Sequence, residues 1–230
     1  MALRYERETA SQVAEFEQTR LEAQGGGNMA FYGAAKRTMD VAGSLCGLIV
    51  LSPVFTVVAL LIKLDDPKSP VMFSQTRIGK NAKPFRMYKF RSMVPDAEKK
   101  LEQLLSQNEI KGAMFKMKDD PRITKIGRFI RKTSIDELPQ LFNVLKGEMS
   151  LVGPRPPLPR EVAEYTEYDK LRLTVHSGCT GLWQVNGRNE LSFEQMVELD
   201  LQYIRQRSIW GDLKIIFRTF KLLLGAKDAF

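Results

Sequence analysis

An uncharged run from Val41 to Ile62 constrains the fold of this chain more than any other feature of its sequence. A run of this length is enough for a helix that reaches across the hydrocarbon core of a bilayer. The run begins far from the N-terminus and has no small-residue cleavage pattern before Lys63, so it does not have the form of a cleaved signal peptide. We therefore expect a membrane helix in this region.

Two features of the run argue against a simple spanning helix. Ser52-Pro53 lies at its midpoint, where proline removes a backbone hydrogen bond and clashes with the preceding turn. Basic residues flank both ends, starting with Lys36 and Arg37, and the positive-inside rule places both flanks in the cytoplasm. A re-entrant helix hairpin broken at Ser52 and Pro53 satisfies both observations, with the Ser52 side chain as a local partner for the freed backbone groups. A spanning helix and a buried soluble helix remain the alternatives.

The N-terminal segment, residues 1–30, differs in composition from the rest of the chain. It contains more glutamates than arginines, and the sequence Gly25-Gly26-Gly27-Asn28 is expected to break any helix. We therefore divide the chain into three parts: an acidic N-terminal extension with a Gly-rich joint (residues 1–30), a re-entrant membrane helix (residues 31–64) and a cytoplasmic domain (residues 65–230).

The charge balance points to an anionic partner. The net charge is +8 and the sequence pI is about 9.5, which suits nucleic acid, an anionic lipid or a phosphorylated substrate. Cys46 and Cys179 do not form a metal-ligand spacing, and a reduced cytosolic setting is the simplest interpretation. His176 is the only histidine, and nothing near it supports a Ser-His-Asp triad.

Residue patterning predicts an α+β fold that is mainly helical. Strands over Val71–Thr76 and Phe85–Arg91 flank a turn and should form a small β-hairpin. Helices are expected over Ala97–Gln107, Lys125–Lys132, Ile135–Leu145 and Trp210–Leu224, with a basic connector over Lys111–Lys118. Lys125–Lys132 is amphipathic and suits a membrane interface, whereas for the apolar stripe of Trp210–Leu224 core packing is the default interpretation and interfacial docking the close alternative. Together with the apolar run, these segments predict a monotopic membrane protein with a re-entrant helix hairpin and interfacial amphipathic helices.

Two adjacent carboxylates, Asp136 and Glu137, lie in a strongly basic neighbourhood. Such acids could hold a divalent ion, while the surrounding cations collect a phosphorylated substrate. A structural interpretation is equally direct, because Ser134 and Glu137 have the spacing of a capping box and acids in the first turn oppose the helix dipole. The octapeptide from Thr133 to Gln140 does not decide between the two.

Two arginines are candidates for phosphate binding. Arg155 stands between Pro154 and Pro156, so the backbone around it is restricted and its guanidinium is aimed in a defined direction. Arg188 lies in a glycine-punctuated loop that runs from Gly178 to Asn189.

The chain resembles the bacterial sugar transferases, the monotopic polyprenol-phosphate phosphoglycosyl transferases. The resemblance covers about residues 34–225 and rests on six features that occur in order. They are Lys36-Arg37, the Ser-Pro pair, Tyr88-Lys89-Phe90-Arg91-Ser92-Met93, the stretch from Asp136-Glu137-Leu138-Pro139 to Asn143-Val144, Val152-Gly153-Pro154-Arg155-Pro156 and Gln184-Val185-Asn186-Gly187-Arg188. The chain is similar to the minimal catalytic form of this family. One departure is His176-Ser177-Gly178-Cys179-Thr180-Gly181, which stands where the family more often has Pro-Gly-Ile-Thr-Gly.

The resemblance implies a membrane enzyme that initiates surface-glycan or exopolysaccharide synthesis. A sugar-1-phosphate would move from a UDP-sugar to undecaprenyl phosphate with release of UMP, at the cytoplasmic face of the bacterial plasma membrane. Asp136 would be the nucleophile, and Asp136 and Glu137 would hold Mg²⁺ or, for Glu137, handle a proton. Substrate binding would fall to Arg155, Arg131, Arg188, Pro154 and Lys89. The sugar would be a hexose such as galactose or glucose, or an N-acetylhexosamine.

The partners implied are thus the UDP-sugar, undecaprenyl phosphate and the lipid bilayer, with a homodimer allowed and nucleic acid not expected. The rival hypothesis is a membrane-tethered basic module that binds nucleic acid or anionic lipid without catalysis. It predicts salt-sensitive binding and no response to the substitution Asp136→Asn.

Overall fold

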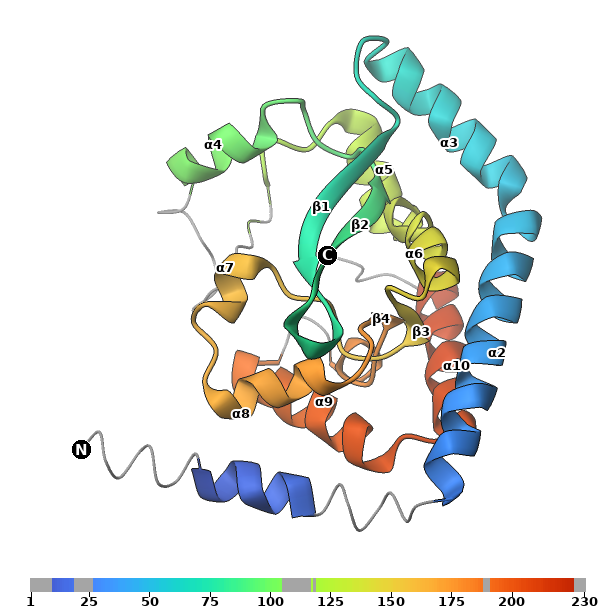
Figure 1. Ribbon diagram of the computed structural model, residues 1–230. Helices are drawn as coiled ribbons and strands as arrows, with labels where there is room; N and C mark the ends of the chain where they lie inside the picture. Colours follow the sequence, from blue (N-terminus) through green and yellow to red (C-terminus); the bar gives the residue numbers. More distant parts are fainter. Residues whose placement is uncertain (1–9, 19–26, 105–116, 118, 188–190, 226–230) are drawn as a thin grey trace.

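The computed structural model describes residues 10–18, 27–104, 117, 119–187 and 191–225. Most of these residues are helical, and their strands form two small two-stranded sheets (Figure 1). After a helix over residues 10–18, the elements follow in the order α2 (Gly27–Val50), α3 (Ser52–Asp65), β1 (Met72–Ile78), η1 (Lys80–Ala82), β2 (Pro84–Phe90), α4 (Ala97–Leu104), α5 (Lys125–Lys132), η3 (Ile135–Glu137), α6 (Gln140–Lys146), β3 (Ser150–Val152), α7 (Pro159–Val162), α8 (Glu167–Lys170), η4 (Leu171–Thr174), β4 (Gly178–Thr180), η5 (Trp183–Val185), α9 (Phe193–Gln206) and α10 (Ile209–Gly225).

The apolar run forms two helices that meet at an angle. Within the described residues no single helix has the length and apolar character needed to cross a membrane, whereas α2 and α3 together pass that test with a bend of 59° between them. They form one long bent arm along the side of the molecule (Figure 1). The predicted break is therefore present, although a bend of this size does not lay the two helices antiparallel as a closed hairpin would.

The backbone at the bend is satisfied locally. Pro53 stands in the first turn of α3, where its missing N–H is harmless. The Ser52 hydroxyl donates to the Ile49 carbonyl over 2.8 Å, a hydrogen bond of the kind predicted for this side chain. The neighbouring ladder continues through the Phe55 N–H to the Leu51 carbonyl. The chain can therefore change direction here without leaving an acceptor at Ile49 unpaired.

The predicted β-hairpin is confirmed. β1 and β2 pair antiparallel from Met72 opposite Phe90 to Ile78 opposite Pro84. Helix α5 has the predicted bounds, and α10 extends the predicted helix by one residue at each end. Helix α4 ends at Leu104 within the described residues, while the predicted connector over Lys111–Lys118 lies outside them except for Met117.

The prediction of one helix from Ile135 to Leu145 is wrong. The chain forms the short 3-10 turn η3 over Ile135–Glu137, and α6 begins only at Gln140. Ser134 has φ 55° and ψ 16° and makes no side-chain cap, because a residue in the left-handed region cannot present its hydroxyl to the N–H groups that follow. Pro139 also withholds the N–H that a continuous helix would need there. The capping-box explanation of Glu137 is thereby excluded, whereas Gly147 ends α6 as predicted, with φ 81°.

The glycine-punctuated segment contains more regular structure than expected. β4 pairs in parallel with β3, with Ser150 opposite Gly178 and Val152 opposite Thr180. A Cβ atom at Gly178 would lie 2.1 Å from the Gly153 nitrogen, so the close approach of the two strands requires glycine. The predicted break at Gly25-Gly26-Gly27-Asn28 lies partly outside the described residues, and within them α2 begins at Gly27.

The interior consists of three apolar clusters around these elements. The largest joins α9, η4, β3 and α10, and Phe16 of the helix over residues 10–18 is 1% exposed within it. A second cluster packs Val58 and Ile62 of α3 against Phe90 and Ile130. One face of α3 therefore belongs to the protein core, and this packing fixes α3 to the strand and helix that precede Asp136.

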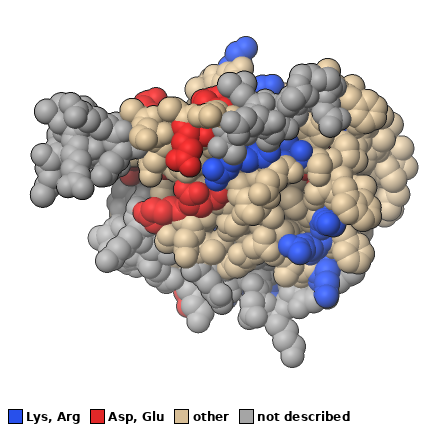
Figure 2. All heavy atoms as spheres, turned by 90° about the horizontal axis from the view of Figure 1, so that it is seen from below, with Lys and Arg blue, Asp and Glu red and all other residues tan. Residues whose placement is uncertain are grey.

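The opposite faces of the helices remain exposed and apolar. Exposed large apolar side chains occur on α2, α3, α5, α6 and α10; they are Phe31, Val41, Leu45, Ile49, Val50, Val57, Leu60, Leu64, Phe129, Phe142, Trp210, Leu213, Phe217, Phe220 and Leu223. Figure 2 shows the molecule from below, with acidic side chains gathered toward the left and mostly uncharged atoms with some basic side chains on the right, where α2 lies. On the face that Figure 2 shows, the acidic side chains are therefore gathered away from the α2 side.

Candidate functional site

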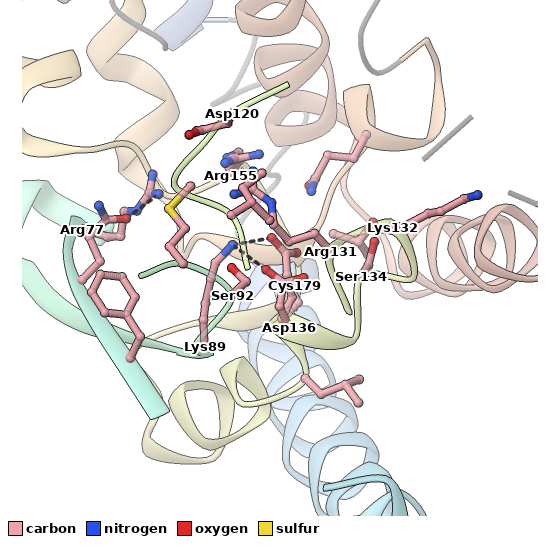
Figure 3. A pocket seen from close by; sticks show the side chains of 18 of the residues that line it. Arg77, Lys89, Ser92, Asp120, Arg131, Lys132, Ser134, Asp136, Arg155 and Cys179 are labelled. Atoms are coloured by element: carbon pink, nitrogen blue, oxygen red, sulfur yellow. Dashed lines mark hydrogen bonds and ion pairs between the residues drawn. The ribbon is translucent and has the colours of Figure 1, made fainter. Parts of the chain in front are cut away.

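The carboxylate pair faces a large cavity of about 2090 Å³. Its polar part contains Asp136 and Glu137 of η3, Lys89 of β2, Arg131 of α5 and Arg155 from the loop after β3. Figure 3 shows these side chains converging from separate elements, with Lys89 directed at the carboxylates. The fold thus brings Lys89, which lies 48 residues before Glu137 in the sequence, to charged side chains of η3, α5 and the loop after β3.

Lys89 is the cation that contacts both acids. Its Nζ donates to Glu137 Oε1 over 2.6 Å and lies 3.9 Å from Asp136 Oδ2. Asp136 is 7% exposed, and among the described residues the 3.9 Å contact is its only ion pair. Lys89 therefore neutralises mainly the Glu137 carboxylate, and the oxygens of Asp136 are available to a ligand.

The two carboxyl groups have opposite electrostatic character. Burial raises the pKa of Asp136, and the positive charge of Lys89 opposes this only in part, so that the pKa is about 6. Burial also acts to raise the pKa of Glu137, but Lys89 and then Arg155 outweigh it and hold the value at about 2. At neutral pH both groups are ionised, and Asp136 is the more basic and hence the better nucleophile of the two.

Asn143 of α6 holds β2 in the register that presents Lys89. Its Oδ1 accepts from the Tyr88 N–H over 3.0 Å, and its Nδ2 donates to the Arg86 carbonyl over 2.7 Å. The same Nδ2 donates to Glu148 Oε2 over 2.7 Å. Asn143 is fully buried, so each of these hydrogen bonds is protected from water and costly to lose. Sequence reasoning assigned no role to this residue, although it lies in the motif that contains Asp136.

Arg77 of β1 fixes the backbone beside Arg155. Its Nη1 donates to the Pro156 carbonyl over 3.0 Å, and the Ile78 N–H donates to the Pro157 carbonyl over 2.9 Å. Burial, followed by the neighbouring charge of Arg155, lowers the pKa of Arg77 to about 10. Arg77 also lines the cavity, and sequence reasoning missed it because only its position on a strand facing Pro156 reveals its role.

The other predicted site residues have different outcomes. Arg131 lines the cavity, and burial lowers the pKa of its guanidinium. Pro154 is buried, and its carbonyl accepts from the Gly178 N–H over 2.8 Å, so its contribution is to hold the loop against β4. Arg188 lies outside the described residues. Ser52 and Pro53 form the bend of the apolar helices, and neither lines the cavity, whereas the adjacent Leu51 does.

A second basic side chain beside Arg131 is neutralised. Arg122 Nη2 lies 2.6 Å from Asp120 Oδ2, and its Nε contacts both oxygens of the same carboxylate. Asp120 therefore cancels the charge of Arg122 on this wall of the cavity. Near the other wall, burial raises the pKa of the Cys179 thiol well above its usual range, so this cysteine is a neutral lining group.

The two adjacent acids have the chemistry of a magnesium site that is completed by ligands from outside the protein. Within the described residues, no group of three or more His, Cys, Asp or Glu side chains could hold a metal by itself. Mg²⁺ in phosphoryl-transfer sites typically takes one or two carboxylates and fills its remaining positions with phosphate oxygens and water. The adjacent carboxylates of Asp136 and Glu137 fit that pattern.

The apolar part of the same cavity is formed by the helices. Met39, Gly43 and Gly47 of α2 line it together with Leu51 at the bend, as do several side chains of α10. A polar reaction centre and an apolar wall therefore share one continuous space.

Comparison with known proteins agrees with this arrangement. The family model described as "Bacterial sugar transferase" matches residues 31–226. The chain is 52% identical over 197 residues to "Galactosyl transferase CpsE" of Streptococcus agalactiae, covering 84% of this chain and 43% of that protein. It is 44% identical over 199 residues to "Undecaprenyl-phosphate galactose phosphotransferase" of Salmonella typhimurium, with 85% and 41% covered.

A third relative is "UDP-glucose:undecaprenyl-phosphate glucose-1-phosphate transferase" of Escherichia coli. It is 43% identical over 195 residues, which cover 80% of this chain and 39% of the relative. The chain thus spans about two fifths of the length of these three curated relatives.

Proposed function

Because the chain belongs to the bacterial sugar transferase family, we propose that it transfers a sugar-1-phosphate from a UDP-sugar to undecaprenyl phosphate and releases UMP. The observation that carries this proposal is the cluster of Lys89, Asp136 and Glu137 in a cavity that is also lined by the apolar helices. A water-soluble diphosphate and a membrane-borne phosphate could both reach such a centre. The product would be the first lipid-linked sugar of an exopolysaccharide, capsule or other surface glycan.

In the first step Asp136 acts as the nucleophile. One of its carboxylate oxygens attacks the phosphorus that carries the sugar, and the bond from this phosphorus to the bridging oxygen breaks, so that UMP leaves with that oxygen. The enzyme then carries an aspartyl phosphosugar. Asp136 is assigned this role in preference to Glu137 because the pKa of its carboxyl group is raised. The Glu137 carboxylate, in contrast, is paired with Lys89.

In the second step the acceptor completes the exchange. A phosphate oxygen of undecaprenyl phosphate attacks the same phosphorus, and the acyl-phosphate bond breaks. The products are undecaprenyl-diphosphate sugar and the free carboxylate of Asp136. Arg155 and Arg131 are positioned to stabilise the negative charge on the phosphoryl oxygens in both steps, and Arg77 holds the backbone next to Arg155.

Mg²⁺ is proposed as the cofactor, held by Glu137 and Asp136 together with the diphosphate. When bound, it supplies positive charge that neutralises the diphosphate and the departing UMP. Lys89, whose Nζ contacts Glu137 Oε1 over 2.6 Å, would orient the Glu137 carboxylate to hold the ion and keep it ionised.

We propose that α2 and α3 enter the cytoplasmic leaflet of the bacterial plasma membrane and return. If the 59° bend is shared equally, each helix inclines at about 30° to the membrane plane. The first residue of α3, at the bend, would then lie about 10 Å deeper in the membrane than its last residue, given the 14 residues of this helix. This shallow entry suits a reaction centre at the level of the headgroups. Engineered cysteines near Lys36 and Asp65 should both react from the cytoplasmic side, and labelling from opposite sides would contradict the re-entrant topology.

Galactose is the sugar we propose first, because two of the three relatives described above are named for galactose and the third for glucose. A panel of UDP-sugars offered with undecaprenyl phosphate and Mg²⁺ to the full chain in lipid nanodiscs tests this. UDP-galactose is expected to give the fastest release of UMP.

The covalent step is tested with a donor labelled in the sugar and no acceptor present. The protein should gain the mass of one sugar phosphate, and peptide mapping should locate it on Asp136. Donor turnover without any protein-bound sugar would exclude the two-step mechanism. Failure of every UDP-sugar, together with salt-sensitive binding that is unaffected by Asp136→Asn, would favour the basic binding module instead.

A further inference from the structure

An apolar groove leads from the reaction centre between α2 and α10. One wall is a stripe with a spacing of four residues, made of Met39, Gly43 and Gly47 of α2 and of Leu51, the residue between α2 and α3. This stripe extends for roughly 18 Å along the helix. The facing wall is one side of α10, formed by Leu213, Ile216, Thr219, Phe220 and Leu223. Figure 1 shows the two helices side by side.

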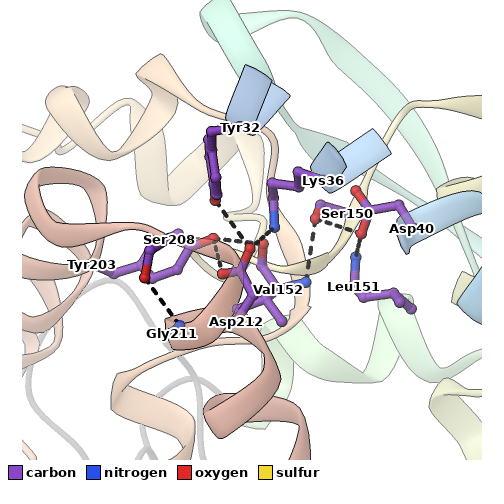
Figure 4. A network of polar contacts seen from close by, with 10 residues as sticks. All are labelled: Tyr32, Lys36, Asp40, Ser150, Leu151, Val152, Tyr203, Ser208, Gly211 and Asp212. Carbon is purple, nitrogen blue, oxygen red and sulfur yellow. Dashed lines mark hydrogen bonds and ion pairs between the residues drawn. The ribbon is translucent and has the colours of Figure 1, made fainter. Parts of the chain in front are cut away.

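The two walls are joined at one end by a buried polar network. Asp212 of α10 accepts hydrogen bonds from Lys36 Nζ over 2.8 Å and Tyr32 Oη over 3.0 Å, both from α2. Tyr203 Oη donates to the other oxygen of Asp212 over 2.9 Å. Figure 4 shows these donors meeting at the carboxylate. Because the Asp212 carboxylate is inaccessible to water, this joint holds the first turn of α10 against α2 and closes that end of the groove.

The floor of the groove keeps the remainder of α10 at a fixed position. Leu151 and Cys179 line it, and the hydroxyls of Thr180 and Thr219 lie 2.8 Å apart, joining β4 to α10. Farther along α10, Phe220 is 60% exposed and Leu223 is 38% exposed. The groove is therefore lined by apolar side chains that are still accessible from outside the protein.

Two glycines of α2 leave space in the groove because they have no side chains. A Cβ atom at Gly47 would lie 3.0 Å from Leu141 Cδ1, and one at Gly43 would lie 2.7 Å from Leu151 Cδ1. Both leucines line the cavity, so any larger side chain on this stripe would occupy space that is now part of the groove or would displace its lining.

We propose that this groove binds the first isoprenoid units of the polyprenyl phosphate acceptor. The inference rests on the proposed function and adds the location of the lipid chain. The cavity is continuous from the apolar walls to Lys89, Arg131 and Asp136, so it offers apolar surface to a hydrocarbon chain and positive charge to the phosphate at the end of that chain. A polyprenyl phosphate has this combination, with a single phosphate attached directly to a linear row of apolar units.

We expect the groove to have a role in the second step alone. The sugar donor has no hydrocarbon chain, so formation of the aspartyl phosphosugar should not depend on the groove. The acceptor step should depend on it, and the dependence should grow with the length of the lipid. This separation allows the inference to be tested independently of the proposed function.

The experiment compares Gly47→Leu, which places a side chain in the groove, with Cys46→Leu as a matched control on the exposed neighbouring position of α2. Leu223→Trp narrows the groove from the opposite wall and provides a second variant if Gly47→Leu does not fold. Each full-length variant is assayed in nanodiscs for the single-turnover burst of UMP and for transfer to undecaprenyl phosphate and to a short alkyl phosphate without isoprenoid units.

We expect both groove variants to keep the UMP burst and to raise the KM for undecaprenyl phosphate about tenfold, with less than a twofold change for the acceptor without isoprenoid units. Cys46→Leu should resemble the unmodified chain with both acceptors. Equal losses with long and short acceptors, or unchanged kinetics in a folded groove variant, would overturn the inference. If added phospholipid lowered the KM of the groove variants again, or raised the KM of the unmodified chain to the same extent, the groove would belong to a bilayer lipid instead. Absence of any UMP burst in the unmodified chain would refute the proposed function, not the groove.

Discussion

Asp136 and Asp212 are both buried carboxylates, but their surroundings differ in the number of donors. Asp212 is 0% exposed and accepts from Tyr32, Lys36 and Tyr203 at distances from 2.8 to 3.0 Å. Asp136 is 7% exposed, and its single ion pair among the described residues is the 3.9 Å contact with Lys89. One carboxylate is saturated by the fold, and the other is left for a ligand.

The difference indicates which buried acid can do chemistry. A carboxylate saturated with donors is held in place and has little tendency to attack a substrate, and removing it leaves its donors unpaired. A buried carboxylate with few partners has a raised pKa and is destabilising until a substrate or ion arrives. Burial alone therefore does not identify the functional residue; the number of its partners does.

The largest effect is expected for Asp136→Asn. Loss of the nucleophile should reduce transfer of the sugar phosphate at least about a thousandfold, because the remaining groups can bind the substrates but cannot form the covalent intermediate. The release of UMP under saturating donor measures this directly. Retention of more than a tenth of the activity would show that Asp136 is not the attacking group.

The same substitution should increase the stability of the protein at neutral pH. The folded-state pKa of Asp136 is about 6, above the value near 3.9 of an exposed aspartate, so the ionised form destabilises the fold and this penalty develops between about pH 4 and pH 6. The melting temperature of Asp136→Asn should exceed that of the unmodified chain at pH 7.5, and the two should converge below about pH 4. A lower melting temperature at pH 7.5 would contradict the comparison.

The opposite pattern is expected for Asp212→Asn. This change leaves the ammonium group of Lys36 buried without a negative partner, and it should destabilise the protein by about 3 kcal/mol, which corresponds to a fall in melting temperature of roughly 6–12 °C. Glu167→Gln is the matched control, because Glu167 pairs with Lys170 on the surface and should contribute less than about 1 kcal/mol. The fraction that remains folded should still form the aspartyl phosphosugar.

A smaller effect is expected for Lys89→Gln. Lys89 lowers the pKa of Asp136, so its removal should raise that pKa further and reduce the ionised fraction near neutrality. In the metal-free protein the pKa of Asp136, about 6 in the unmodified chain, is expected to move upward, and the acidic limb of the pH–rate profile should shift in the same direction. Lys83→Gln removes an exposed lysine of the same β-hairpin and should leave the limb in place. If the limb did not shift in Lys89→Gln, Lys89 would not control the pKa of Asp136.

The smallest effect is expected for Tyr32→Phe. It removes one of three donors to Asp212, and since Lys36 and Tyr203 remain, the loss of stability should be about 1 kcal/mol. Thermal unfolding in parallel with Asp212→Asn measures the ratio of the two effects. If both variants lost equal stability, the network would depend on the tyrosine and the three donors would not be equivalent partners.

Local sequence patterns predicted the elements whose cause is local. The proline at position 53, the neighbouring Ser52 hydroxyl and the uncharged run anticipated the bend between α2 and α3. Alternation and turn residues anticipated β1 and β2, and amphipathic spacing anticipated α5 and α10. These succeed because each depends on residues within a few positions of one another.

Local patterns failed where long-range packing competes with them. Ser134 and Glu137 have the spacing of a capping box, yet Ser134 is left-handed and Glu137 binds Lys89 of a distant strand. The parallel pairing of β3 with β4 was missed because both strands are very short and their partners are far apart in the chain. Counting charges over residues 1–30 could not reveal that Phe16 packs into the main apolar core.

The sequence by itself determined the family, the bent apolar helices and the identity of the acids and bases from which the site is built. Only the tertiary structure distinguished Asp136 from Asp212, and only it gave roles to Arg77 and Asn143. The physical reason is that a carboxylate owes its reactivity to the groups packed around it, and those groups come from residues as far away as Lys36 is from Asp212. The amino-acid sequence shows which charged groups are available, whereas the tertiary fold decides which of them are paired.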